Sequence, residues 1–191
     1  KLFVGDKLAY SFAMTPEAHQ QFPAFINLQQ YYVEQYLVER CAELPEIELR
    51  WKNRLVGLQH GRDEVLLDIE TPDGRYRIAA QYVIAADGVR STVRTAMGLG
   101  FPGQVFNDRF LIADVHMKAS FPSERWFWFD PPFHRHQSAL LHRQADDVWR
   151  IDFQLGIDAD PEREGQLAAV TPRLKAMLGQ DIVFDYECVS V

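Results

Sequence analysis

Between residues 28 and 43, apolar side chains recur at spacings of three and four, which predicts an amphipathic helix. Asn27 is a suitable cap at its start, and Pro45 stops it. Residues 1–25 contain two prolines and show no helical period, so we expect strand and loop in that segment.

After residue 46 the hydrophobic period changes to two, which is the pattern of β-strands. Turn residues at 61–63 and 72–74 separate the first runs, which predicts an antiparallel meander. The next run, Tyr82–Ala86, is apolar throughout and predicts a buried strand whose carboxyl end opens onto a site. A short helix is expected over Ser91–Met97, ended by Gly98. The expected strands of the meander are Ile47–Trp51, Arg54–His60, Val65–Thr71 and Arg75–Ala80.

The sequence Phe-Pro-Gly at 101–103 interrupts the pattern and predicts a domain boundary, with one domain over 1–103 and a second over 104–191. The second domain is expected to hold an aromatic-rich β-sheet and a helix over Glu162–Leu178 that Pro172 kinks or divides. The fold class is therefore α+β, with a meander in one domain and a mixed or antiparallel sheet in the other. The expected strands of this sheet are Phe110–Lys118, Arg125–Asp130, Gln137–Gln144, Val148–Gly156 and Ile182–Val191.

Composition excludes several classes of partner. The chain has 191 residues, of which 47% are hydrophobic, so it can bury a core. A formal charge of −7 argues against nucleic acid or an anionic membrane surface and favours a small-molecule ligand. No stretch reaches the roughly 18 apolar residues of a membrane span. Cys41 and Cys188 lack metal-ligand or redox spacing, so we expect free thiols and a cytoplasmic location.

The most informative stretch is YVIAADGVRSTVR, residues 82–94. An apolar run delivers an Asp-Gly turn at Asp87 and Gly88, and Ser91 and Arg94 follow in the first turn of a helix. The order is longer than an ordinary turn requires. Helix N-termini offer backbone N–H groups to phosphate, glycine allows close approach, and an aspartate can accept bonds from ribose hydroxyls or order a water.

This stretch resembles the Asp-Gly motif of the FAD-dependent aromatic hydroxylases of the p-hydroxybenzoate hydroxylase type. In that family the motif lies beside the cofactor's pyrophosphate and is implicated in binding both FAD and NAD(P)H. Upstream, Gln30 matches the family's glutamine at the helix that runs along the flavin, with Gln29 as the rival match. The strings ADGVRSTVR and WRIDFQLG are most similar to the 3-(3-hydroxyphenyl)propionate hydroxylase branch.

The resemblance implies a monooxygenase that hydroxylates a phenolic or other aromatic substrate with FAD, NAD(P)H and O2, and it is compatible with a homodimer. The family's Gly-x-Gly-x-x-Gly and Gly-Asp motifs are absent from the sequence, and we expect them before Lys1 and after Val191. The chain is thus expected to be an internal piece that alone neither retains FAD tightly nor turns over.

The second sheet supplies the candidate substrate contacts. Along residues 148–155, apolar and polar side chains alternate, which places Arg150 and Asp152 on one face. His142 and Arg150 are candidate anchors for a phenolate or carboxylate, while a surface pair of Arg150 and Asp152 is the simpler alternative. His134 and His136 lack a third ligand at fixed spacing, so no metal site is predicted.

Two other functions stay open. A ubiquinone-biosynthesis hydroxylase, a halogenase or an epoxidase shares the Asp-Gly element within the same flavoprotein superfamily. A module that binds an apolar ligand without chemistry would also suit a sheet rich in aromatic side chains. Flanking sequence with or without the two missing flavin motifs discriminates between the flavoproteins and the binding module.

Overall fold

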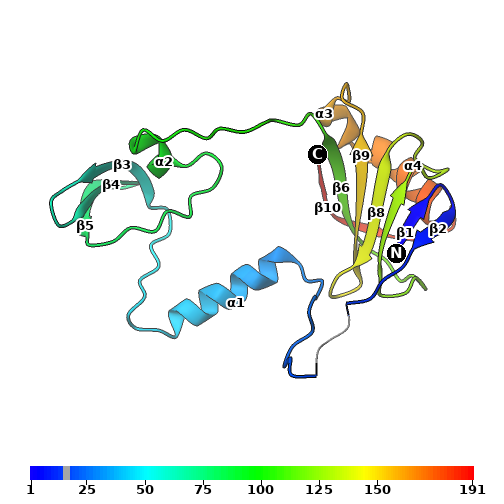
Figure 1. The fold of residues 1–191 in the computed structure, drawn as a ribbon, viewed down its shortest axis with the longest axis horizontal. Coiled ribbons are helices and arrows are strands. Elements are labelled where there is room, and N and C mark those ends of the chain that lie inside the picture. The colour runs from blue at the N-terminus through cyan, green and yellow to red at the C-terminus, as the bar shows by residue number, and fades with distance from the viewer. Residues whose placement is uncertain (15–17) are drawn as a thin grey trace. The chain divides into compact units, whose positions relative to one another are not determined.

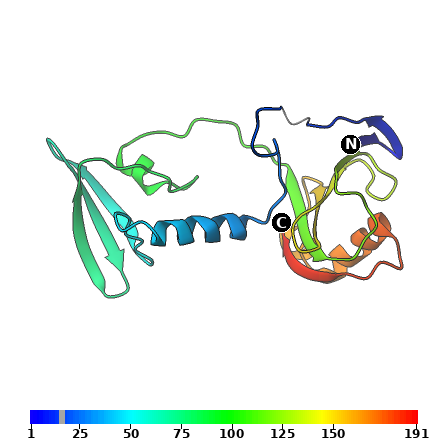
Figure 2. The same ribbon diagram turned by 90° about the horizontal axis from the view of Figure 1, so that it is seen from below.

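The computed structural model describes every residue of the chain except 15–17, so the part of the expected N-terminal loop that falls there lies outside the described residues. The chain divides into two compact units. One comprises residues 1–36 together with 106–191, and the other comprises 37–105, so the division falls within the first helix. Figures 1 and 2 show the elements of each unit.

The larger unit is built on a seven-stranded mixed sheet with the order β10-β6-β9-β8-β7-β1-β2. Neighbouring strands are antiparallel except β1 and β7, which run parallel. Two helices, α3 (Pro161–Glu164) and α4 (Leu167–Leu178), follow β9 in the chain (Figure 1). The strands are β1 (Leu2–Val4), β2 (Lys7–Tyr10), β6 (Arg109–His116), β7 (Arg125–Phe129), β8 (Ser138–Arg143), β9 (Val148–Leu155) and β10 (Asp185–Ser190).

The core of this unit lies between one face of the sheet and α4 (Leu167–Leu178). Trp149, Ile151 and Phe153 on β9 are at most 1% exposed, and Val170 and Leu174 of α4 pack against them. The alternation predicted along β9 is confirmed, because the intervening polar side chains are only partly buried. Apolar burial on this single face stabilises the sheet.

The smaller unit contains a three-stranded antiparallel meander of β3 (Arg54–His60), β4 (Val65–Thr71) and β5 (Gly74–Ala80). The α+β fold class, with a meander and a mixed sheet, is therefore confirmed. The short helix α2 (Thr92–Ala96) follows the meander, and α1 (Gln30–Ala42) precedes it. None of the residues of α1 is buried.

Three expected elements differ from the structure. Residues 47–51 form no strand, and neither do residues 82–86, whose Tyr82 and Ile84 are 88% and 93% exposed. A buried strand requires neighbours on both edges, and the described residues provide none beside Tyr82–Ala86. The late helix divides at Gly165 into α3 (Pro161–Glu164) and α4, whereas Pro172 is accommodated inside α4. Glycine weakens helix propagation, which explains the position of the break.

The structural units differ from the expected division at the N-terminus. Leu2 to Val4 lie in register beside Phe127 to Phe129, so β1 belongs to the large sheet. The chain returns from the smaller unit to the larger unit between residues 105 and 106, close to the expected boundary at 103. Both cysteines are free thiols. In the part of the chain that the structure describes, no helix is both long and apolar enough to cross a membrane.

Candidate functional site

The Asp-Gly turn of the smaller unit is held by its own side chains. The two carboxylate oxygens of Asp87 accept bonds from the Ser91 hydroxyl at 2.6 Å and from the Val93 N–H at 3.1 Å. The Ser91 hydroxyl oxygen in turn accepts a bond from the Arg94 N–H at 2.9 Å and caps α2. The Ser91 hydroxyl, followed by the Val93 N–H, lowers the pKa of Asp87, so the carboxylate stays charged.

This bonding changes what the turn offers a ligand. Backbone N–H groups at the start of this helix were expected to be available to a phosphate. Those of Val93 and Arg94 already donate to Asp87 and Ser91. Gly88 has a φ of +75°, a conformation that favours glycine, and no heavy atom of a described residue beyond its two chain neighbours lies within 4 Å of the position that a Cβ would take. The turn therefore presents a fixed carboxylate beside an open glycine.

Arg94 is held against the motif rather than solvated. Its Nη2 donates to the Val89 carbonyl oxygen at 2.6 Å, and its guanidinium lies 4.4 Å from the centre of the Phe101 ring. The aromatic face favours the cation, so the side chain is ordered before any ligand arrives.

The two glutamines at the start of α1 have different surroundings. Gln30 is exposed, and its Nε2 donates to Glu34 of the same helix at 2.7 Å. Gln29 is only 5% exposed, and its Nε2 donates to the carbonyl oxygen of Ala145 in the β8–β9 turn at 2.9 Å. The Oε1 atom of Gln29 has no hydrogen-bond partner among the described residues. The rival match is thus the buried glutamine, while Gln30 faces outward.

The three candidate substrate residues lie on one face of the large sheet. His142 of β8 is the register partner of Arg150 on β9, and Asp152 follows two residues later on the same face. Arg150 is paired with Asp114 of β6, because its Nε and Nη2 donate to the two carboxylate oxygens at 2.9 and 2.7 Å. A surface pair between Arg150 and Asp152 is not formed. The sequence analysis missed Asp114, since a lone acidic residue inside an apolar strand was the only signal for it.

Burial shapes the electrostatics of this polar face. His142 is 8% exposed, and burial, then the nearby charges of Arg125 and Arg150, lower its pKa to about 4. Burial also raises the pKa of Asp152. His142 Nδ1 and Asp152 Oδ1 are buried without a bonding partner among the described residues. A neutral imidazole and a carboxyl group thus keep unused capacity to bind a polar group.

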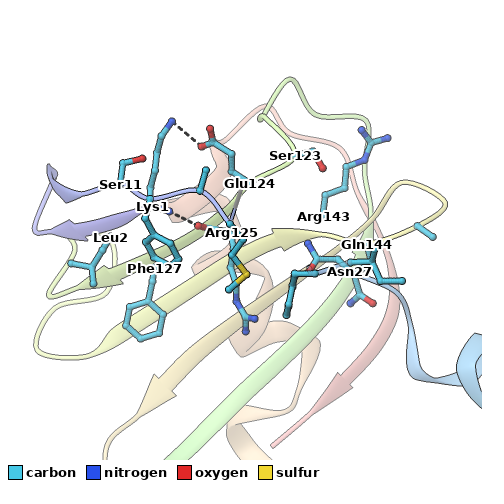
Figure 3. A pocket seen from close by; sticks show the side chains of 16 residues that line it. Lys1, Leu2, Ser11, Asn27, Ser123, Glu124, Arg125, Phe127, Arg143 and Gln144 are labelled. Atoms are coloured by element: carbon cyan, nitrogen blue, oxygen red, sulfur yellow. Dashed lines mark hydrogen bonds and ion pairs between the residues drawn. The ribbon is translucent and has the colours of Figure 1, made fainter. Parts of the chain in front are cut away.

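An open hollow of about 1000 Å³ lies in the larger unit and was not foreseen from the sequence. Figure 3 shows its lining, with Lys1 beside Glu124 and with Arg125 and Phe127 following on β7. Residues 12–14 and 25–26, which precede α1, supply further apolar surface to the hollow. Segments that are distant in the sequence therefore meet around one concave surface.

The two histidines near the β7–β8 turn have different surroundings. The His134 Nε2 lies 2.6 Å from the Gln154 carbonyl oxygen, and the His136 side chain is 91% exposed. Among all residues with described positions, no group of three or more His, Cys, Asp or Glu could hold a metal ion.

Comparison with known families gives a match over most of the chain. Residues 6–185 match the family model described as "FAD binding domain". Para-nitrophenol 4-monooxygenase of Pseudomonas sp. strain WBC-3 is 33% identical over 95 residues, which cover 50% of this chain and 24% of that protein. The 3-(3-hydroxy-phenyl)propionate/3-hydroxycinnamic acid hydroxylase of Mycolicibacterium smegmatis is 29% identical over 100 residues, covering 52% of this chain and 18% of that protein. The chain thus spans a quarter or less of the length of these two relatives.

Solved structures share the fold. The p-nitrophenol 4-monooxygenase PnpA from Pseudomonas putida DLL-E4 has a TM-score of 0.74 at 24% identity, covering 85% of this chain and 41% of that one. The flavin-dependent monooxygenase PieE, solved in complex with FAD and substrate, also has a TM-score of 0.74, at 21% identity, covering 86% of this chain and 30% of that one.

Proposed function

Because the chain belongs to the FAD binding domain family of aromatic hydroxylases, we propose that it is part of a longer monooxygenase that hydroxylates a phenolic or other aromatic substrate using NAD(P)H and O2. The observation that carries the proposal is that one continuous family match spans both the Asp-Gly turn and most of the large mixed sheet. A binding module without chemistry would need the sheet alone.

The residues proposed to bind the cofactor fall in each unit separately: the Asp-Gly turn belongs to the smaller unit, and Gln30 at the start of α1 belongs to the larger unit. FAD, when bound, supplies the redox chemistry that takes electrons from NAD(P)H and activates oxygen. The turn fits such a ligand at its hydroxyl-bearing part, because a fixed carboxylate stands beside a glycine with open space around it. The residues assigned to cofactor binding are Gln30, Asp87, Gly88, Ser91 and Arg94.

Each of these residues has a distinct role in the proposal. Asp87 accepts bonds from hydroxyl groups or an ordered water, and Gly88 permits close approach. Ser91 fixes the carboxylate, and Arg94 braces the turn through the Val89 carbonyl. Gln30 faces outward from α1, and among the described residues it would have to break its surface bond to Glu34 to reach a ligand.

The substrate side lies on the polar face of the large sheet. His142, Arg150 and Asp152 converge there, and two of them bear buried atoms without a bonding partner among the described residues. Arg150 is already neutralised by Asp114, so it positions its neighbours rather than offering a free charge. His142, held neutral by burial, is suited to hydrogen-bond a phenol.

The chain taken alone is proposed to be inactive. The Val93 and Arg94 amides are engaged in capping, so these two N–H groups are not available to a phosphate. Tight retention of FAD then requires the glycine-rich and Gly-Asp motifs of a longer protein.

The test is expression of the full-length protein that carries this chain, followed by desalting and a visible absorption spectrum. We expect flavin bands, NAD(P)H oxidation stimulated by phenols, and a hydroxylated product. A flavin-containing protein that halogenates or epoxidises instead would replace the hydroxylase by another member of the superfamily. A colourless, folded protein that cannot be reconstituted with FAD would refute the proposal and leave the binding module.

A further inference from the structure

The hollow of the larger unit combines apolar walls with an unbalanced positive charge. Its cationic side chains are those of Lys1, Arg125 and Arg143. Lys1 Nζ lies 2.8 Å from a carboxylate oxygen of Glu124, and Arg143 is paired with Asp147. No carboxylate among the described residues pairs with the Arg125 guanidinium. One full charge therefore remains available to a ligand.

Arg125 stands where an aromatic ligand could reach both its charge and an apolar surface. It lies two residues before Phe127 on β7, so both side chains project from the same face of the sheet and both line the hollow. Phe12, Phe25 and Ile26 supply apolar surface to the same hollow. Ligand sites typically combine a largely apolar lining with a few polar groups that fix the orientation.

None of the described neighbours of Arg125 forms an ion pair with its guanidinium. Its register partner on β8 is His142, whose lowered pKa leaves the imidazole neutral near pH 7. Two acidic residues lie on the same face: Asp114 is already engaged by the Nε and Nη2 atoms of Arg150, while Asp152 interacts with Arg125 electrostatically without forming an ion pair with it. Guanidinium groups bind carboxylates and other oxyanions through paired hydrogen bonds, which are stronger than bonds between neutral groups.

We propose that Arg125 binds the negatively charged oxygen group of an aromatic substrate whose ring occupies the hollow beside Phe127. This inference rests on the proposed function and narrows its substrate class to aromatic anions. Arg125 is then a determinant of specificity, because it separates an aromatic anion from its uncharged analogue. The volume of about 1000 Å³ admits a ring with a side chain of several atoms.

The experiment measures binding rather than turnover. The full-length flavin-loaded protein is titrated with 3-(3-hydroxyphenyl)propionate, benzoate and 4-nitrophenolate, and with the uncharged amide of the first, by following the flavin absorbance. For Arg125→Gln we expect anion affinity to fall at least about tenfold while amide affinity stays within about twofold. Arg125→Lys should restore part of the loss because it keeps the charge.

The matched control is Arg163→Gln, which removes an exposed arginine of α3 from the same unit and should leave all affinities unchanged. Circular dichroism melting checks that each variant is folded. Equal weakening of anion and amide by Arg125→Gln, no weakening, or failure of every anion to bind the wild type overturns the inference. If the protein holds no flavin, the proposed function fails separately, and calorimetric titration with the same ligands still tests Arg125.

Discussion

The buried His142 predicts a specific loss of stability in mild acid. Its folded pKa is about 4, below the ordinary value of 6.5, because burial and the charges of Arg125 and Arg150 disfavour the imidazolium. As pH falls below 6.5, the unfolded chain therefore takes up a proton at this position before the folded chain does. Proton uptake then favours unfolding, and the stabilisation present at neutral pH is lost between pH 6.5 and about 4.

The magnitude follows from the two pKa values. At pH 4.5 the linkage relation gives a ceiling of about 2.5 kcal/mol, and screening at the open face of the sheet reduces the expected effect to about 1.5 kcal/mol. Asp152 acts in the opposite sense, since its raised pKa lets the folded protein bind a proton more readily as the pH falls. A His142→Gln variant removes the first effect and retains the second.

The assay is urea unfolding of wild type and His142→Gln at pH 7.0 and pH 4.5. When the pH is lowered from 7.0 to 4.5, we expect wild type to lose about 1.5 kcal/mol more of its free energy of unfolding than His142→Gln loses. His136→Asn is the control, because it removes a largely exposed imidazole at a position of positive φ that asparagine tolerates. Identical pH dependence for wild type and His142→Gln would refute the electrostatic argument.

Three further substitutions test the fold and the turn. Asp114→Ala removes both bonds to the half-exposed Arg150 and should lower the free energy of unfolding by about 2 kcal/mol, whereas no change in urea unfolding would contradict the pairing. Phe153→Ala, at a position with 0% exposure, should cost about 3–5 kcal/mol in the same assay, and a cost below about 1 kcal/mol would place Phe153 outside the core. Ser91→Ala removes the cap bond to the Arg94 N–H and should cost about 1 kcal/mol locally; unaltered hydrogen exchange of the α2 amides would speak against the capping role.

Elements that depend on local pattern could be predicted from the sequence. The meander of β3 to β5 follows from alternating residues and the turns between them, and the buried face of β9 follows from the position of Trp149 and Phe153. The run Tyr82–Ala86 was assigned wrongly to a buried strand, because its apolar composition says nothing about whether neighbouring strands exist.

Features that depend on distant contacts could not be predicted. No local pattern indicates that β1 pairs with β7 or that Asp114 neutralises Arg150. The hollow beside Arg125 likewise forms from segments far apart in the chain. The motif at Asp87 was visible because its residues are contiguous, but its internal hydrogen bonds required the folded turn.

The parallel pairing of β1 with β7 governs how the molecule assembles on the ribosome. Phe127, the partner of Leu2, emerges on the order of ten seconds after it at typical rates of synthesis. The smaller unit, residues 37–105, is contiguous and complete before β7 exists, so it can fold first. The large sheet must instead close a long chain segment, which is slow and leaves the β1–β2 hairpin transiently without its neighbour β7. Nascent chains should therefore depend on chaperones until β7 and β8 have been translated.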